Sequence, residues 1–246
     1  MDNFDNAVSS FKNLPAWAQV VEMVQEVPQL PATIQKALVY LGDSSNVDLR
    51  ELTSILESDP GITAKILKVA NSSLFSRSKE IANLVTATNL LGLKILKGIL
   101  IATSLKDLCA PSTDFLRHAW KKSGLTLKLV REICEKNPSL NAEDLATMAI
   151  IHNIGEIVLG SNSKYQQITV RAFDAAINEK EGLTIVLEDI IGFKPSLVSA
   201  LLVKKWSFPD SLCYHILHRD SPLELLSWND NQLIHHAVFQ LASLTA

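Results

Sequence analysis

Apolar residues recur with a period near 3.6 along almost the whole chain, and this periodicity most narrows the range of folds open to it. In one segment Ile62, Ile66 and Ala70 share a face, while Lys65 points away from it. Only 9 glycines and 9 prolines interrupt the 246 residues, and most stand at predicted helix ends. Strand-like alternation is scarce. The sequence therefore predicts an all-α fold class.

Several helix starts can be predicted from capping residues. Asp48 can accept hydrogen bonds from first-turn amides, and Glu51 stands where it completes a capping box. Asp59 precedes Pro60, which combines a capping carboxylate with a residue suited to the first helical position. Asn141 offers another start, followed by acidic residues at the positive end of the helix dipole.

A cluster of helix-breaking residues at 110–113 divides the chain near its middle. We therefore expect an N-terminal helical subdomain over residues 1–110 and a second helical subdomain over residues 111–246, together forming one continuous unit. The segment 90–105 is almost entirely apolar, interrupted only by Lys94 and Lys97. Such a segment must be covered, and the second half is its expected partner.

Composition and cysteine usage favour a soluble protein of the cytoplasm. The chain is 47% hydrophobic and 20% charged, as expected of an ordered globular protein. Cys109, Cys134 and Cys213 are widely spaced and form no C-x-x-C motif, so a reducing compartment is the simpler interpretation. The acidic, polar N-terminus does not resemble a signal peptide, and no apolar stretch is long enough to predict a membrane span.

The charge balance argues against nucleic acid as a partner. With 23 basic and 26 acidic residues, the net charge is −3, which is unfavourable for a sequence-independent nucleic-acid binder. The best local basic candidates are Lys121 and Lys122, with Lys128 and Arg131 further along. On an acidic protein such residues more often form a solvated helix face.

The string Ile151-His152-Asn153-Ile154-Gly155 is the most informative local motif. A histidine predicted in mid-helix among apolar residues is either a core histidine with one hydrogen bond or part of a His–Asp metal-binding dyad. Asn153 cannot act as a charged ligand or as a base. His118, His152 and His218 could together hold a zinc ion, but their spacing does not show that they converge.

Several strings together resemble the HDOD domain, a bacterial signal-transduction module related to the HD metal-dependent phosphohydrolases. The matching strings over roughly residues 26–225 are Leu30-Pro31, Glu57-Ser58-Asp59-Pro60, Leu67-Lys68-Val69-Ala70-Asn71-Ser72, Leu91-Gly92 and the segment around His152. The resemblance implies a multi-helix HDOD fold, in which an N-terminal helical subdomain packs on an HD-like helical bundle. It also implies a regulatory role rather than catalysis.

The departures from the family pattern fall on the metal site that the resemblance implies. Asn153 replaces the dyad aspartate, Pro195 and Arg219 replace histidines, and Ser243 lies near the position of the last aspartate. Loss of anionic ligands weakens metal affinity. We therefore expect a vestigial pocket with no catalytic residue, formed by His118, His152, Asn153, His218 and Arg219. We also expect Asn153→Asp to increase divalent-metal binding.

The predicted function is a non-catalytic regulatory module with a degenerate HD metal site. It would act through a protein partner in a signalling pathway or through a small ligand, and Arg219 makes an anion physically reasonable. No cofactor is expected. If a divalent metal binds, the candidate ligands are His118, His152 and His218. The alternative is a metal-dependent phosphohydrolase acting on a nucleotide or cyclic dinucleotide. The sequence leaves the oligomeric state open.

Overall fold

A computed structural model of the chain describes residues 4–27, 30–42, 47–75, 80–108, 112–179, 182–221, 234 and 236–241. Within these ranges every regular element is helical, which confirms the all-α fold class. In chain order the elements are α1 (Phe4–Ser9), η1 (Ser10–Asn13), α2 (Trp17–Glu26), α3 (Ala32–Gly42), α4 (Leu49–Glu57), α5 (Pro60–Ala70), α6 (Leu84–Leu91), α7 (Leu93–Leu108), α8 (Asp114–Lys136), α9 (Ala142–Ile151), α10 (Ile154–Ser161), α11 (Gln166–Glu179), α12 (Leu183–Ile191), α13 (Pro195–Lys205) and α14 (Asp210–Leu217). Residues 236–241 form a further helical segment.

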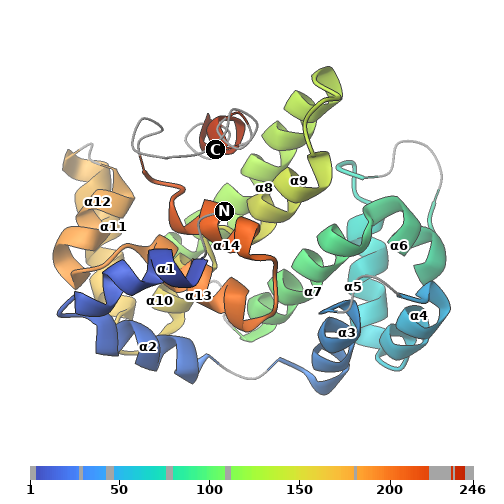
Figure 1. The fold of residues 1–246 in the computed structure, drawn as a ribbon, viewed down its shortest axis with the longest axis horizontal. Helices are drawn as coiled ribbons and strands as arrows, with labels where there is room; N and C mark the ends of the chain where they lie inside the picture. Colours follow the sequence, from blue (N-terminus) through green and yellow to red (C-terminus); the bar gives the residue numbers. More distant parts are fainter. Residues whose placement is uncertain are drawn as a thin grey trace.

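The helices form two lobes joined by α7 (Figure 1). Helices α3 to α6 make one lobe, and α10 to α14 make the other, with α8 and α9 between them. Helices α1 and α2 pack against α14 and α13, so the first helices of the chain belong to the lobe formed by its second half. The expected division at residue 110 stays a prediction.

The predicted helix caps are largely confirmed. Asp48 and Asp59 each accept hydrogen bonds from first-turn amides, and Asn141 does the same at the start of α9. Glu51 does not reach back to complete a capping box. Its carboxylate instead accepts a hydrogen bond from the hydroxyl of Tyr40, 2.9 Å away, because α3 packs beside α4. A tertiary contact thus replaces the local one.

Helix α7 packs against α9, which confirms that the second half of the chain covers this apolar segment. Lys97 does not interrupt the covered face. It is only 7% exposed, and its Nζ donates a hydrogen bond of 2.7 Å to the Ser207 carbonyl oxygen and lies 4.4 Å from the centroid of the Phe208 ring. No single helix in the described ranges is long and apolar enough to cross a membrane. Helix α6 and most of α7 together have the required length and apolar composition, but the two are bent by 108° relative to each other.

The chain bends between α9 and α10 at His152 and Asn153. The prediction that His152 lies in mid-helix is therefore wrong: it is the C-cap of α9, and Asn153 is the N-cap of α10. Gly155 lets α10 approach α13 closely, since a Cβ at this position would lie 2.1 Å from the Pro195 carbonyl oxygen. This close approach fixes α10, and with it the polar side chains near its start.

Candidate ligand-binding site

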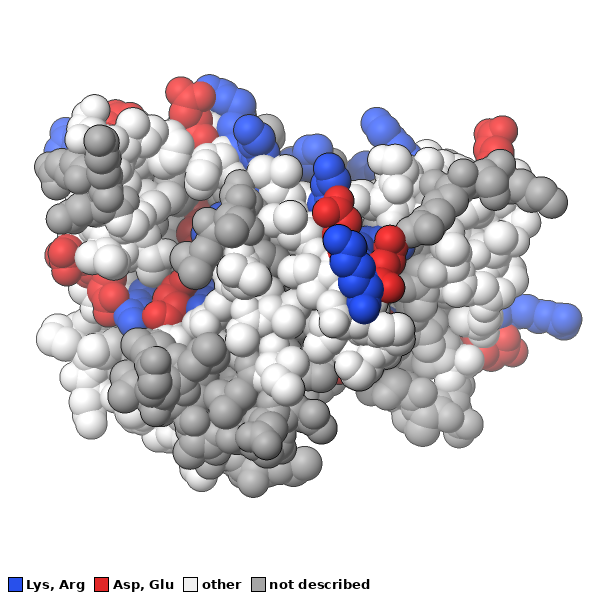
Figure 2. Space-filling view, turned by 90° about the horizontal axis from the view of Figure 1, so that it is seen from above, with Lys and Arg blue, Asp and Glu red and all other residues white. Residues whose placement is uncertain are grey.

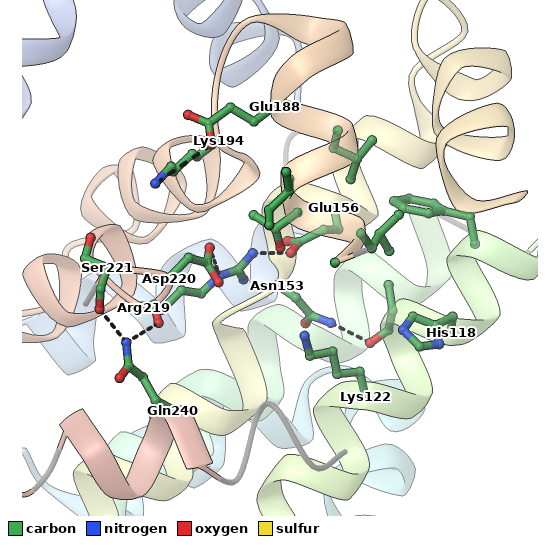
Figure 3. Close-up of a pocket in the computed structure, with 17 residues that line it drawn as sticks. His118, Lys122, Asn153, Glu156, Glu188, Lys194, Arg219, Asp220, Ser221 and Gln240 are labelled. Atoms are coloured by element: carbon green, nitrogen blue, oxygen red, sulfur yellow. Dashed lines mark hydrogen bonds and ion pairs between the residues drawn. The ribbon is translucent and has the colours of Figure 1, made fainter. Parts of the chain in front are cut away.

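A cavity of about 450 Å³ lies where α8, α10, α12 and the segment after α14 meet. Its polar wall comes from elements far apart in sequence, as Figure 3 shows. The labelled residues that line it are His118, Lys122, Asn153, Glu156, Glu188, Lys194, Arg219, Asp220, Ser221 and Gln240. Apolar residues of α8 and α12 complete it. A volume of this size suits a small organic ligand.

Arg219 is the most strongly held charge in the wall. Its side chain is 3% exposed and forms ion pairs with Glu156 and, at 3.1 Å, with Asp220. It also donates a hydrogen bond to the His152 carbonyl oxygen. Burial acts to lower the pKa of Arg219, but the charges of Glu156 and Asp220 outweigh burial and raise it. The guanidinium is therefore a permanent cation inside the lobe.

Asn153 uses both ends of its amide to bind α8. Its Nδ2 donates to the Ala119 carbonyl oxygen, and its Oδ1 accepts from the Ser123 hydroxyl, each over 2.5 Å. The residue is 1% exposed. A carboxylate cannot donate, so the contact with Ala119 specifically needs an amide. Asn153 thus holds α10 against α8.

Lys122 reaches into the cavity from α8 (Figure 3). It is partly buried, and its ammonium forms no ion pair or hydrogen bond with the part of the chain that the structure describes. Burial lowers the pKa of Lys122, and the charge of Arg219 lowers it further. A cation in this position lacks the compensation that Arg219 receives, so an anion in the cavity would stabilise it.

His118 lies one turn before Lys122 on the same wall. Burial lowers the pKa of His118, and the charges of Lys122 and Lys121 lower it further. Across the cavity, the second carboxylate oxygen of Glu156, Oε2, is buried and accepts no hydrogen bond from the described residues. The cavity therefore presents, at Lys122, a cation that has no ion-pair partner among the described residues.

The structure brings together three of the five residues predicted for the vestigial pocket. His118, Asn153 and Arg219 line the cavity. His152 is not among the lining residues: its ring packs against Phe239, at 5.3 Å between centroids, and its Nδ1 donates to the Ala149 carbonyl oxygen over 3.0 Å. His218 is outside the cavity lining and packs on Tyr214, at 4.5 Å between centroids. The Ser243 position lies outside the described residues.

The donor set does not fit the metal that an HD-like site implies. Within the described ranges no group of three or more His, Cys, Asp or Glu side chains is placed to hold a metal ion. His152 Nε2 is a buried acceptor without a hydrogen-bond partner there, which would suit a ligand nitrogen. Burial lowers the pKa of His152, and the charges of Arg219 and Lys122 lower it further, which keeps the ring neutral. The two charges themselves, however, repel a divalent cation from this position.

A family model for the HDOD domain matches residues 27–222. The chain belongs to the HDOD family. The match begins at the end of α2 and ends after α14, so it includes every residue that lines the cavity except Gln240. None of the curated proteins matches the chain.

Solved HDOD-like structures share this fold. A Geobacter sulfurreducens HDOD domain protein of unknown function is 19% identical, with a TM-score of 0.70 over 93% of this chain and 78% of that one. A Shewanella amazonensis protein named "Putative phosphohydrolase" is 20% identical, with a TM-score of 0.71 over 94% of this chain and 81% of that one. A Marinobacter aquaeolei protein named "Putative signal transduction protein" is 16% identical, with a TM-score of 0.63 over 94% of this chain and 55% of that one.

Sequence reasoning missed two charged residues of the cavity wall, one on α8 and one on α10. Lys122 follows His118 by one turn on α8, and Glu156 follows Asn153 by one turn on α10. Side chains spaced by three or four share a helix face, so both could have been added to the candidate site. From the sequence alone, Lys122 pairs with Lys121 as a basic residue of a solvated helix face.

The C-terminal helical segment makes the stability of this HDOD chain sensitive to acid. His236 is buried, and its Nε2 donates to the His218 carbonyl oxygen while its Nδ1 faces that of His215. Burial and the neighbouring His215 lower the pKa of His236 to about 4, although Asp220 acts in the opposite direction. Protonation of His236 is therefore less favourable in the folded state than in the unfolded state.

This stabilisation should be fully present above the unfolded pKa of about 6.5 and should be lost as pH falls toward 4, by at most about 3 kcal/mol. Urea unfolding measured from pH 7 to pH 4 tests this expectation. His236→Gln removes the titrating group, so its free energy of unfolding should fall less steeply over that range. Equal slopes for both proteins would contradict the assignment.

Proposed function

We propose that the chain is a non-catalytic regulatory module whose cavity binds a small anion instead of a metal ion. The observation that carries this proposal is the Arg219–Glu156 ion pair, which puts a guanidinium and not a metal ligand in contact with the α9–α10 bend. Asn153 is fully engaged with α8 and offers no carboxylate. Lys122 remains as the cation to which an incoming anion can bind.

The alternative of a metal-dependent phosphohydrolase is less consistent with this wall. Metal-assisted hydrolysis needs ligands that hold the ion and activate a bound water. Here Glu156 is paired with Arg219, and His118, the histidine among the lining residues, shares its helix face with Lys122. The phosphohydrolase and signal-transduction names of the solved structures belong to those proteins.

A nucleic-acid role has little support. Lys122 faces the cavity, Lys128 pairs with Glu132 at 3.9 Å, and Arg131 stacks 4.5 Å from the centroid of the Phe75 ring. These residues therefore do not combine into a basic surface. Figure 2 shows acidic and basic side chains interspersed over the face that it presents.

Metal content and turnover test the non-catalytic part of the proposal. Protein purified from cells supplied with manganese, iron and zinc should contain far less than one metal ion per chain by elemental analysis. It should also fail to hydrolyse bis(p-nitrophenyl) phosphate in added Mn²⁺. Stoichiometric metal together with turnover would overturn the proposal and establish the phosphohydrolase alternative.

Anion binding is tested with pyrophosphate as the probe and Lys122→Gln as the variant. Pyrophosphate should raise the melting temperature of the wild type, and calorimetry should show at least tenfold weaker binding to Lys122→Gln. Lys121→Gln is the matched control, because the neighbouring Lys121 is exposed and carries the same charge. Without ligand, Lys122→Gln should be at least as stable as the wild type, since it removes an uncompensated cation. Equal pyrophosphate affinities for the two variants would contradict the assignment.

A further inference from the structure

A second cavity, of about 650 Å³, opens on a different face of α8 from the first. It is a groove between α5, α7 and α8, and we refer to it as the α5–α8 groove. Its floor is apolar, with Val69 and Phe75 on one side and Ile99, Leu127 and Ile150 on the other. It therefore lies between the lobe of α3 to α6 and the central helices.

Gly124 leaves part of this floor without a side chain. It lies inside the 23-residue helix α8, where glycine is the least favourable residue after proline. Its φ is not positive, and a Cβ added to it would have no atom within 4 Å. Neither backbone conformation nor close packing within the chain therefore requires glycine. Its structural effect is to keep the groove open, as expected where another molecule approaches the helix.

The polar atoms around the groove suit an anion with an apolar body. Lys68 and Lys106 line it, are exposed, and form no ion pair within the described ranges. Trp120 also lines the groove, and its indole Nε1 is buried with no hydrogen-bond acceptor among the described residues. The two exposed ammonium groups that line the groove are complementary to a negatively charged group.

We propose that the α5–α8 groove is a binding site for an amphipathic anion. Its apolar body would lie over Gly124 and Leu127, and its anionic head would contact Lys68 or Lys106. This site is separate from the cavity that contains Arg219, and the proposal does not depend on the function proposed for that cavity. A linear alkyl carboxylate has the required chemistry: an apolar chain that the floor can bury and a head that the lysines can bind.

Isothermal titration calorimetry with decanoate tests the site. The wild type should bind decanoate saturably with one site per chain. Decanol and decylamine should bind at least tenfold more weakly, because neither provides an anionic head. The Lys68→Gln/Lys106→Gln double variant should lose at least tenfold in decanoate affinity. Equal affinity for decylamine and decanoate would overturn the proposal.

The Gly124→Leu variant tests whether decanoate binds in the α5–α8 groove. Leucine favours the helix and meets open space at its Cβ, so the variant should fold and melt at or above the wild-type temperature while losing decanoate binding. Ala64→Leu is the matched control, since Ala64 is exposed on α5 outside the groove lining. Undiminished binding to Gly124→Leu, or no saturable decanoate binding to the wild type, would overturn the proposal. Capture of a protein by a photo-crosslinker at position 124, without decanoate binding, would assign the groove to a protein partner and also overturn it.

Discussion

Arg219→Met is expected to lower the free energy of unfolding by about 3–5 kcal/mol at pH 7. The substitution leaves the carboxylate of Glu156 buried without its cation and removes the donor to the His152 carbonyl oxygen. Methionine occupies a similar volume to arginine. The decrease in the free energy of unfolding therefore comes from the lost charge and not from a new cavity. Urea-induced unfolding, with the slope of the transition compared between proteins, measures the effect.

The Arg219→Met/Glu156→Leu double variant is the matched control. Removing both charges avoids an uncompensated buried carboxylate, so the double variant should be more stable than Arg219→Met alone. This comparison separates the cost of an unpaired charge from the cost of altered packing. An Arg219→Met protein within 1 kcal/mol of the wild type would show that Glu156 gains little from Arg219 in the folded state.

Asn153→Asp is expected to destabilise the protein by about 2–3 kcal/mol rather than to restore a metal site. The aspartate cannot donate to the Ala119 carbonyl oxygen, and it would place a carboxylate oxygen against that acceptor. Arg219 and Lys122 would still repel a cation at this position. The sequence alone predicts that this substitution increases metal binding, whereas the contacts of Asn153 lead us to expect the opposite result.

Unfolding measurements and a calorimetric Mn²⁺ titration test both parts of this prediction. Ser123→Ala is the control, because it removes only the hydrogen bond to Asn153 Oδ1 and leaves the amide donor in place. It should cost about 1 kcal/mol. An Asn153→Asp protein that is as stable as the wild type and binds one Mn²⁺ would show that the cavity keeps a metal-site geometry, which would contradict the proposed function.

Local chemistry allowed much of the fold to be predicted. The apolar period determines which helix faces are buried, and the carboxylates of Asp48 and Asp59 cap helices through contacts within a few residues. Such interactions depend on neighbours along the chain, so they can be predicted from the sequence. Glu51 is the exception, because Tyr40 on a neighbouring helix donates a hydrogen bond to its carboxylate and replaces the local contact. A contact between helices of this kind cannot be predicted from neighbours along the chain.

The sequence by itself determined the all-helical fold and the HDOD family, and it places an asparagine at position 153. Only the tertiary structure decided what that asparagine contacts. Arg219 and Glu156 are separated by 63 residues, and Asn153 meets Ala119 across 34. No local pattern specifies such pairs, because they depend on how α8, α10 and the segment after α14 pack. The same packing brings Lys122 into the cavity and leaves His218 outside its wall.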